Sequence, residues 1–251
     1  MGRRTDEIAD LSHDFDKMAG QLGELVLARD RLLADVSHEL RTPLARLNLA
    51  IGLARQDPSN LDDALKRISG EAGKLDEMVG ELLSLAKLES NSGDGEDYFN
   101  FAEVVESVVR DARYEAAPKH IEIALDAPPN SADFGWVAKG SGKLISRAVE
   151  NVVRNAVRYA PDGGTVNLAL SHIGDKIVLT VDDNGPGVPN EALLTMFDPF
   201  SESADGFGFG LGLAIARRAI TVHGGSISAQ NKNPNGLRTT ITFPSSGMDS
   251  A

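Results

Sequence analysis

The chain has no cysteine and no apolar run approaching 18 residues. Without cysteine it forms neither a disulfide nor a thiolate metal site, and without a long apolar run the sequence predicts no membrane-spanning helix. Basic residues are outnumbered, with 25 Lys and Arg against 37 Asp and Glu, and the net charge of -12 argues against non-specific nucleic-acid binding. Residues 1–6 are polar, and no apolar segment of the signal-peptide type follows them. We therefore expect a soluble, cytoplasmic chain, whose 251 residues suffice for two modest domains.

The first part of the chain, from about Asp6 to Glu89, has an almost wholly helical pattern of apolar residues. The composition of residues 57–60, Asp-Pro-Ser-Asn, indicates a turn within it. The pattern predicts two long helices in an antiparallel hairpin. Because one hairpin buries its apolar stripes poorly, we expect two copies to form a four-helix bundle, and the protein to be a homodimer.

Residues 91–96 are polar and glycine-rich and mark the clearest domain boundary. Beyond them the sequence predicts mixed helices and strands. We expect an α+β sandwich of antiparallel strands, with helices covering one face of the sheet. The expected helices lie around Phe101–Ala116, Gly142–Tyr159 and Leu211–His223, and the expected strands at His120–Leu125, Thr165–Leu170, Lys176–Val181, Ser226–Gln230 and Thr239–Phe243.

A histidine motif, Ser-His-Glu-Leu-Arg-Thr-Pro at residues 37–43, lies inside the first helical pattern. It places His38 and Thr42 one turn apart on one helix face, with Glu39 beside the histidine. A nucleophilic imidazole needs a neighbour that takes its proton, and an adjacent carboxylate can do so. The simpler interpretation is a surface histidine on a charged helix.

Two asparagines, Asn151 and Asn155, are spaced one turn apart in the expected helix Gly142–Tyr159. Their amide oxygens suit a hard cation such as Mg²⁺, which usually shares its coordination with nucleotide phosphates and water, or they contact the phosphates themselves. Asparagine is a poor helix former, so the pair is informative. The simpler interpretation is a helix with two solvated asparagines.

Two glycine-rich segments flank an aromatic one. Residues 182–187 (DDNGPG) follow an apolar strand, where a carboxylate can accept a hydrogen bond from an exocyclic amine such as that of adenine, although a tight turn is the alternative. Residues 206–215 alternate glycines before a helix whose first N–H groups can hold phosphate, without the lysine of a Walker A loop. The aromatics of Met196–Phe200, between them, are more typical of a hydrophobic anchor at the base of a loop than of a ligand contact.

In this order, the segments resemble the H, N, G1, F and G2 boxes of the sensor histidine kinases of two-component systems. The resemblance covers about residues 6–245, and the phrases DVSHELRTPLARL, ENVVRNAVRYA and DDNGPGV are similar to the Cpx-type kinases of Gram-negative bacteria. It implies a dimeric helical hairpin, or four-helix bundle, followed by an ATP-binding sandwich of the gyrase, Hsp90 and histidine kinase type. Residues 1–27 would be a HAMP second helix and signalling helix, 28–91 the dimerisation and phosphotransfer domain, and 92–251 the catalytic domain. The chain would then be the cytoplasmic part of a bacterial inner-membrane protein.

The resemblance also implies a protein-histidine kinase that phosphorylates His38 from ATP and Mg²⁺ and passes the phosphate to an aspartate of a response regulator. Glu39 would be the base or orienting partner, and Thr42 would orient a hydrolytic water in a phosphatase reaction on that regulator. Asn155 would hold the metal. The implied nucleotide site comprises Asn151, Asn155, Arg158, Tyr159, Asp183, Gly185, Gly187, Phe200, Gly208, Gly210, Leu211, Gly212 and Leu213.

One segment departs from the family pattern. Ser201–Asp205 is short and acidic, where many relatives carry a tyrosine or basic residue and a longer loop, and like charge beside a triphosphate costs energy. Arg158 is then the nearest basic candidate for the γ-phosphate. Two alternatives remain: another ATPase of the same nucleotide-binding fold, which gives His38 and the hairpin no role, and a catalytically silent dimeric scaffold, which leaves the intact boxes unexplained.

Overall fold

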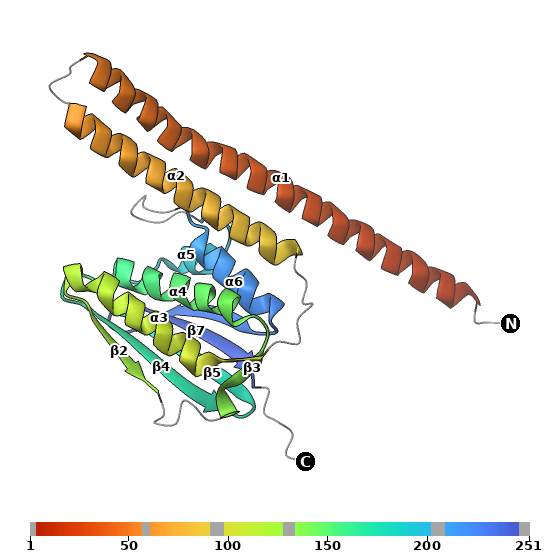
Figure 1. The fold of residues 1–251 in the computed structure, drawn as a ribbon. Helices are drawn as coiled ribbons and strands as arrows, with labels where there is room; N and C mark the ends of the chain where they lie inside the picture. Colours follow the sequence, from red (N-terminus) through yellow and green to blue (C-terminus); the bar gives the residue numbers. More distant parts are fainter. Residues whose placement is uncertain (1–3, 57–60, 91–97, 128–133, 202–208, 246–251) are drawn as a thin grey trace. The chain divides into compact units, whose positions relative to one another are not determined.

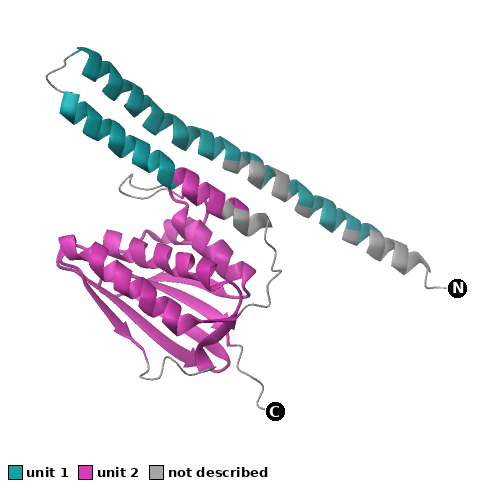
Figure 2. Ribbon diagram, viewed as in Figure 1, with its two compact units in different colours: residues 1–77 teal, residues 78–251 magenta. Residues whose placement is uncertain are grey.

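The computed structural model describes residues 4–56, 61–90, 98–127, 134–201 and 209–245. The chain divides into two compact units, residues 1–77 and residues 78–251 (Figure 2). The turn expected at residues 57–60, the linker expected at residues 91–96 and most of the acidic segment Ser201–Asp205 lie outside the described residues. No helix in the described part of the chain is both long and apolar enough to cross a membrane.

Two long helices form the N-terminal part, α1 (Arg4–Gln56) and α2 (Leu61–Ser90) (Figure 1). They run side by side as the predicted hairpin. Glu71 of α2 lies 3.9 Å from the guanidinium of Arg46 in α1, and it also binds Lys74 of its own helix at 2.7 Å. Small buried residues, Ala50 and Ala64, occupy the side of each helix that is covered. Large apolar side chains of both helices remain exposed, among them Leu44, Leu49, Ile51, Leu53, Leu61 and Leu65.

A five-stranded sheet with the order β2-β4-β5-β7-β6 forms the centre of the C-terminal part. The strands are β2 (Glu122–Asp126), β4 (Thr165–Ile173), β5 (Lys176–Asp183), β6 (Ser226–Asn231) and β7 (Leu237–Pro244), and a two-stranded sheet pairs β1 (Tyr98–Asn100) with β3 (Val137–Lys139). The expectation of antiparallel strands is wrong for one pair, because β2 and β4 run parallel. The long helix between them in sequence serves as the crossover connection that parallel neighbours require.

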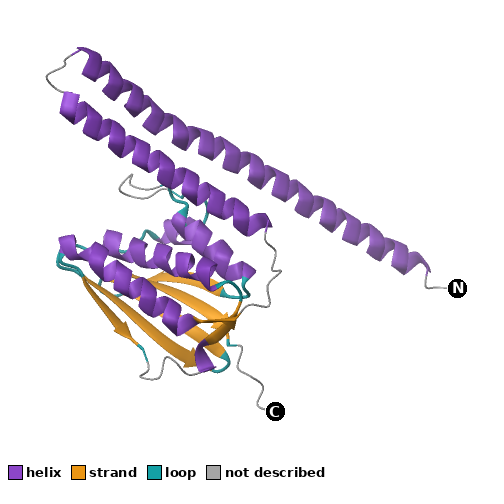
Figure 3. Ribbon diagram, in the orientation of Figure 1, coloured by secondary structure: helices purple, strands orange, loops and turns teal. Residues whose placement is uncertain are grey.

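Three helices cover one face of this sheet: α3 (Phe101–Ala116), α4 (Gly142–Tyr159) and α6 (Gly212–Val222) (Figure 3). A short helix, α5 (Asn190–Thr195), and 3-10 turns at Ala117–Lys119 and Phe134–Trp136 complete the described elements. The side chain of Asn100 caps α3 by accepting the N–H groups of residues 102 and 103. The core between helices and sheet is fully buried, with Val105, Ile145, Val149, Leu168, Leu179, Ile215, Ile241 and Phe243 among its members.

Candidate nucleotide and phospho-acceptor sites

The end of β5 holds Asp183, a carboxylate that is only 4% exposed. Its Oδ1 accepts the backbone N–H of Gly185 at 2.9 Å and that of Leu237 at 3.1 Å. No described residue donates a hydrogen bond to Oδ2. Burial raises the pKa of Asp183, and the two backbone N–H groups oppose that rise only in part. The second oxygen therefore remains available as an acceptor for a ligand donor.

Asp182 and Asn184, on either side of Asp183, are also fixed by hydrogen bonds. Asp182 accepts both Nε and Nη2 of Arg238, at 2.7 and 2.6 Å, and lies 3.2 Å from the ammonium of Lys232. Burial alone would raise the pKa of Asp182, but the hydrogen bonds and charges of Arg238 and Lys232 together hold it below its ordinary value. Asn184 Oδ1 accepts the N–H of Thr165 at 2.9 Å. The strand end is thus a rigid platform.

The glycines after β5 lie where side chains would collide. A Cβ on Gly185 would lie 2.6 Å from the carbonyl oxygen of Tyr159, the last residue of α4. Gly187 has φ +77°, and its Cβ would lie 2.8 Å from Asn231 Oδ1. The same Asn231 brackets the loop by bonding both the N–H and the carbonyl of Val188, at 2.8 and 2.6 Å. The loop is therefore packed closely between α4 and β6.

Asn151 and Asn155 both lie on α4, and the structure gives them different surroundings. The amide of Asn151 donates to the carbonyl of Gly212 at 3.0 Å, which joins α4 to the start of α6. Asn155 is half-buried, and within the described ranges its amide makes no hydrogen bond. Its oxygen is therefore free for an oxygen-seeking cation.

Arg158 and Tyr159 end α4 beside the glycine loop. The guanidinium of Arg158 lies over the Tyr159 ring, 5.4 Å from its centroid. Its Nη2 is buried and has no hydrogen-bond partner among the described residues. A buried guanidinium nitrogen without a partner requires an explanation, and an anionic ligand would supply one.

The second glycine segment leads into α6, whose N-cap, Leu211, is buried and offers no side-chain hydrogen bond. Leu211 therefore leaves the first N–H groups of the helix, including those of Gly212 and Leu213, without a capping side chain, and such groups attract anions. Gly210 has φ +65°, and a Cβ there would lie 2.5 Å from the carbonyl oxygen of Ser201. Gly208 lies outside the described residues.

The aromatic segment packs beneath these loops. Met196 and Phe197 are buried and form a cluster with Leu237 of β7. Phe200 is half-buried and has a left-handed backbone with φ +58°, and its N–H bonds the carbonyl of Gly210 at 3.1 Å. Met196 and Phe197 therefore have the surroundings of an anchor, and Phe200 joins the end of this segment to the second glycine segment.

The histidine motif lies within α1. His38 and Thr42 are exposed and Glu39 is half-buried, whereas Pro43 is buried in the helix interior. Proline has no N–H, so the carbonyl of Glu39 lacks its usual helical donor four residues on. The imidazole makes no hydrogen bond to another described residue. An exposed, unpaired imidazole is accessible to a reaction partner.

The sequence motifs thus fall into two groups. The nucleotide candidates Asn151, Asn155, Arg158, Tyr159, Asp183, Gly185, Gly187, Phe200, Gly210, Leu211, Gly212 and Leu213 belong to residues 78–251, whereas His38, Glu39 and Thr42 belong to residues 1–77. Sequence reasoning missed Asn231, Lys232 and Arg238, which support the first group from β6, β7 and their connection. They carry no motif, and only strand pairing brings them to the site.

Comparison with known proteins identifies both parts. Residues 140–247 match the family described as histidine kinase-, DNA gyrase B-, and HSP90-like ATPase, and residues 28–91 match the His Kinase A (phospho-acceptor) domain. The sensor histidine kinase CpxA of Escherichia coli K12 is 34% identical over 235 residues, which are 92% of this chain and 50% of that protein. The heme sensor protein HssS of Staphylococcus saprophyticus is 29% identical over 249 residues, which are 96% of this chain and 52% of that protein.

Solved structures have the same fold. The mycobacterial sensor histidine kinase MprB matches with a TM-score of 0.54 and 28% identity, over 61% of this chain and 100% of that one. Histidine kinase ThkA, solved in complex with the response regulator TrrA, matches with a TM-score of 0.70 and 23% identity over 88% of this chain and 65% of that one, which shows the fold alone.

The chain spans about half the length of the curated relatives it matches. Its described part nevertheless contains both the hairpin and the sheet domain, in the order in which the two family matches occur. A phospho-acceptor domain followed by an ATPase domain, together with homology to sensor kinases over most of its residues, shows that the chain belongs to the sensor histidine kinase family.

Proposed function

We propose that the chain transfers the γ-phosphoryl group of ATP to the imidazole of His38 and then to an aspartate of a response regulator. One observation carries the proposal: an exposed histidine with an adjacent carboxylate lies on a His Kinase A hairpin, and an ATPase domain of the histidine kinase type follows on the same chain. A related ATPase or a silent scaffold would need no such histidine.

The nucleotide is held through its base at the end of β5. Asp183 Oδ2 accepts the 6-amino group of adenine, because its other oxygen is already used by two backbone N–H groups. The glycines at residues 185 and 187 let the purine approach the backbone. Tyr159 contributes an aromatic surface beside the base.

The phosphates are held at α4 and α6. The free N–H groups at the start of α6, at Gly212 and Leu213, face the negative charge, with Gly210 and Leu211 shaping the turn and Gly208 belonging to the same segment. The unpartnered Nη2 of Arg158 adds the cation that the acidic segment Ser201–Asp205 lacks. Phosphoryl transfer depends mainly on such positioning and charge stabilisation.

A divalent cation fits this site. Asn155 supplies an uncommitted amide oxygen, Asn151 lies one turn away, and Mg²⁺ is usually bound by one or two protein oxygens together with phosphates and water. Bound there, Mg²⁺ would neutralise charge on the phosphates during transfer. Asn151 donates its amide N–H to the carbonyl of Gly212 and thereby ties α4 to the start of α6.

At the acceptor, an imidazole nitrogen of His38 forms a P–N bond as the bond between the γ-phosphorus and the ADP oxygen breaks. Glu39 takes or orients the proton of the ring, a role worth about 10²–10⁴-fold in rate. The regulator's aspartate then attacks phosphorus and imidazole leaves. Thr42, on the same face, orients a water for hydrolysis of the regulator's acyl phosphate, which gives the chain a phosphatase activity as well.

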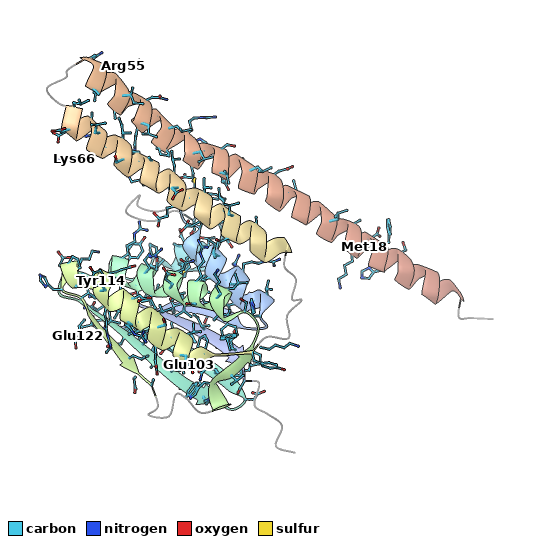
Figure 4. The ribbon with its side chains drawn as sticks, in the orientation of Figure 1. Met18, Arg55, Lys66, Glu103, Tyr114 and Glu122 are labelled. Atoms are coloured by element: carbon cyan, nitrogen blue, oxygen red, sulfur yellow. The ribbon has the colours of Figure 1, made fainter. Side chains whose placement is uncertain are left out.

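Two copies complete the hairpin. Exposed leucines on α1 and α2, such as Leu44 and Leu65, suit a four-helix bundle. Towards the N-terminus, Phe15, Met18 and Leu22 are also exposed, and their three- and four-residue spacing suits a helix that packs against its own copy (Figure 4 labels Met18). We assign residues 1–27 to a HAMP-derived signalling helix, 28–91 to dimerisation and phosphotransfer, and 92–251 to catalysis.

The proposal is tested by incubating the chain with Mg²⁺ and ATP labelled in the γ-phosphate. We expect label that survives alkali, is lost in acid and maps to the peptide containing His38. The other histidines, such as His13, serve as internal controls. Label at another residue, or free phosphate released without any labelled intermediate, would favour a different ATPase.

A further inference from the structure

The mechanism above leaves one charged cluster without a role. Asp182, Lys232 and Arg238 form it at the end of β5, on the face of the sheet opposite to the helices. The face follows from strand alternation, because Leu179, Val181 and Asp183 share the covered side and Asp182 points the other way. Arg238 is the direct cross-strand partner of Asp182, and its guanidinium makes a two-bond fork with that carboxylate.

The cluster is connected to Asp183 by several short routes. Leu237, adjacent to Arg238, donates its N–H to Asp183 Oδ1 at 3.1 Å. Lys232 reaches the carbonyl oxygen of Asp183 at 3.5 Å as well as the carboxylate of Asp182. The N–H of Lys232 bonds the carbonyl of Gly236, and Gly236 packs so closely on Asp183 that an added Cβ would collide with the Asp183 carbonyl oxygen. The ion pairs therefore press the β6–β7 turn onto the strand end that carries Asp183.

The same groups set the charge around Asp183. Burial is the main cause of the raised pKa of Asp183; the positive charge of Lys232 opposes the rise, and the negative charge of Asp182 adds a little to it. Arg238 neutralises Asp182 from the far face of the sheet. Backbone donors fix one oxygen of Asp183, and the other oxygen therefore has a single defined position.

We propose, on the basis of the function proposed above, that Asp182, Lys232 and Arg238 are positioning residues that hold the Asp183 carboxyl group in one orientation and so determine the preference for 6-aminopurine over 6-oxopurine nucleotides. Adenine presents an amine at C6, which a fixed carboxylate accepts. Hypoxanthine presents a carbonyl oxygen there, which a fixed carboxylate repels. An Asp183 that is misaligned or protonated loses the first interaction and relaxes the second.

The test is equilibrium binding of ATP and of inosine 5′-triphosphate to the full chain and to Arg238→Gln. We expect the variant to lose about tenfold in affinity for ATP, the order expected when a charge-assisted hydrogen bond is misaligned. Affinity for the inosine nucleotide should change by less than about twofold on the same reasoning. The ratio of ATP affinity to inosine-nucleotide affinity therefore falls. Arg238→Lys keeps the charge but loses the two-bond fork, and its ratio should lie between those of the unmodified chain and Arg238→Gln.

A control is Arg154→Gln on α4, which breaks an arginine–carboxylate contact of the same length, 2.6 Å, at an arginine of similar exposure and should leave the ratio unchanged. Equal loss of both nucleotides in Arg238→Gln would overturn the proposal, because that is the effect of a merely structural ion pair. Should Arg238→Gln fail to fold, Lys232→Gln must lower the ratio. If the unmodified chain binds neither nucleotide, the proposed function itself fails. If the unmodified chain becomes labelled at His38 and the variants have the same affinity ratio as that chain, only the positioning role is wrong.

Discussion

The hairpin and the sheet domain bury their apolar residues very differently. In the sheet domain the largest core side chains, such as Phe101, Leu168 and Phe243, are almost wholly inaccessible to solvent. In the hairpin Leu44 is 48% exposed and Leu65 49% exposed. Full burial of a leucine stabilises by roughly 1.5–3 kcal/mol, so the hairpin leaves much of its stabilisation unused within one chain. The sheet domain completes its own core, whereas the hairpin leaves its leucines exposed for the second copy that we propose.

The two regions treat their chemical groups just as differently. Asp182, Asp183 and Asn184 are each held by hydrogen bonds, as a preformed binding site requires. His38 is exposed and makes no bond to another described residue. In the function that we propose, His38 meets first a nucleotide and then a regulator, which requires an accessible imidazole. The difference agrees with the proposed division of roles, in which the sheet domain holds the nucleotide rigidly and the hairpin presents an accessible histidine.

The largest expected effect comes from removing the metal ligand. Asn155→Ala should lower the rate of His38 labelling by about 10²–10³-fold, because charge on the transferring phosphoryl group is no longer neutralised. Labelling rate and nucleotide affinity are measured on the same preparation. Glu150→Gln, on the same helix, is the control and should label normally. A labelling rate within twofold of the unmodified chain would remove Asn155 from the site.

The next effect tests the hairpin alone. Leu65→Glu would place a charge in the proposed interface of both copies and should raise the dimer dissociation constant by about 100-fold. Sedimentation measures the change, and ATP binding should stay unaltered. Lys66→Gln, at the adjacent and 81% exposed position, should leave the dimer intact. A stable Leu65→Glu dimer would mean that this stripe is not the interface.

A smaller effect concerns Asp183 and pH. Because burial raises its pKa in the folded chain, Asp183 takes up a proton at a higher pH than an ordinary carboxyl. A protonated carboxyl is a poorer acceptor, so ATP affinity should be constant above that pKa and fall as the pH drops through it. Asp183→Asn should lose about tenfold in affinity at neutral pH and flatten the profile. An acid-insensitive affinity in the unmodified chain would contradict this role.

The smallest effect is on stability. The pKa of Asp182 is depressed in the folded chain, so its ion pairs stabilise above the unfolded value of about 3.9 and are lost as the pH falls through the folded one. Asp182→Asn should cost about 1 kcal/mol at pH 7, since its partner Arg238 is 41% exposed and screened by solvent. Denaturant unfolding should show a smaller cost as the pH is lowered below the unfolded value. An equal cost at pH 7 and at the lower pH would assign the effect to packing.

The fold was predictable wherever local signals are strong. Phe101–Ala116 and Gly142–Tyr159 are helices with the expected bounds, because their apolar periodicity is regular. β1, β3 and α5 have three to six residues and are too short to show a period. The parallel pairing of β2 with β4 was missed because strand order depends on contacts far apart in sequence.

The residues of the candidate site could be predicted from the sequence, but the hydrogen bonds and ion pairs that support them could not. Asn151, Asp183 and the glycines could be identified from the sequence because an amide, a carboxylate and a lack of side chains occur next to predicted helices and strands. That Asn151 donates to Gly212, or that Arg238 backs Asp182 across the sheet, depends on tertiary pairing over dozens of residues. No local pattern encodes such contacts.

The measurement that tests the division between the two regions most directly is made on His38→Gln, with ATP affinity and covalent label determined in the same sample. The account predicts an ATP affinity equal to that of the unmodified chain and no alkali-stable label, because the nucleotide site belongs wholly to the sheet domain. Persistent label would show that His38 is not the acceptor, and a large loss of ATP affinity would show that the two regions do not have separate roles.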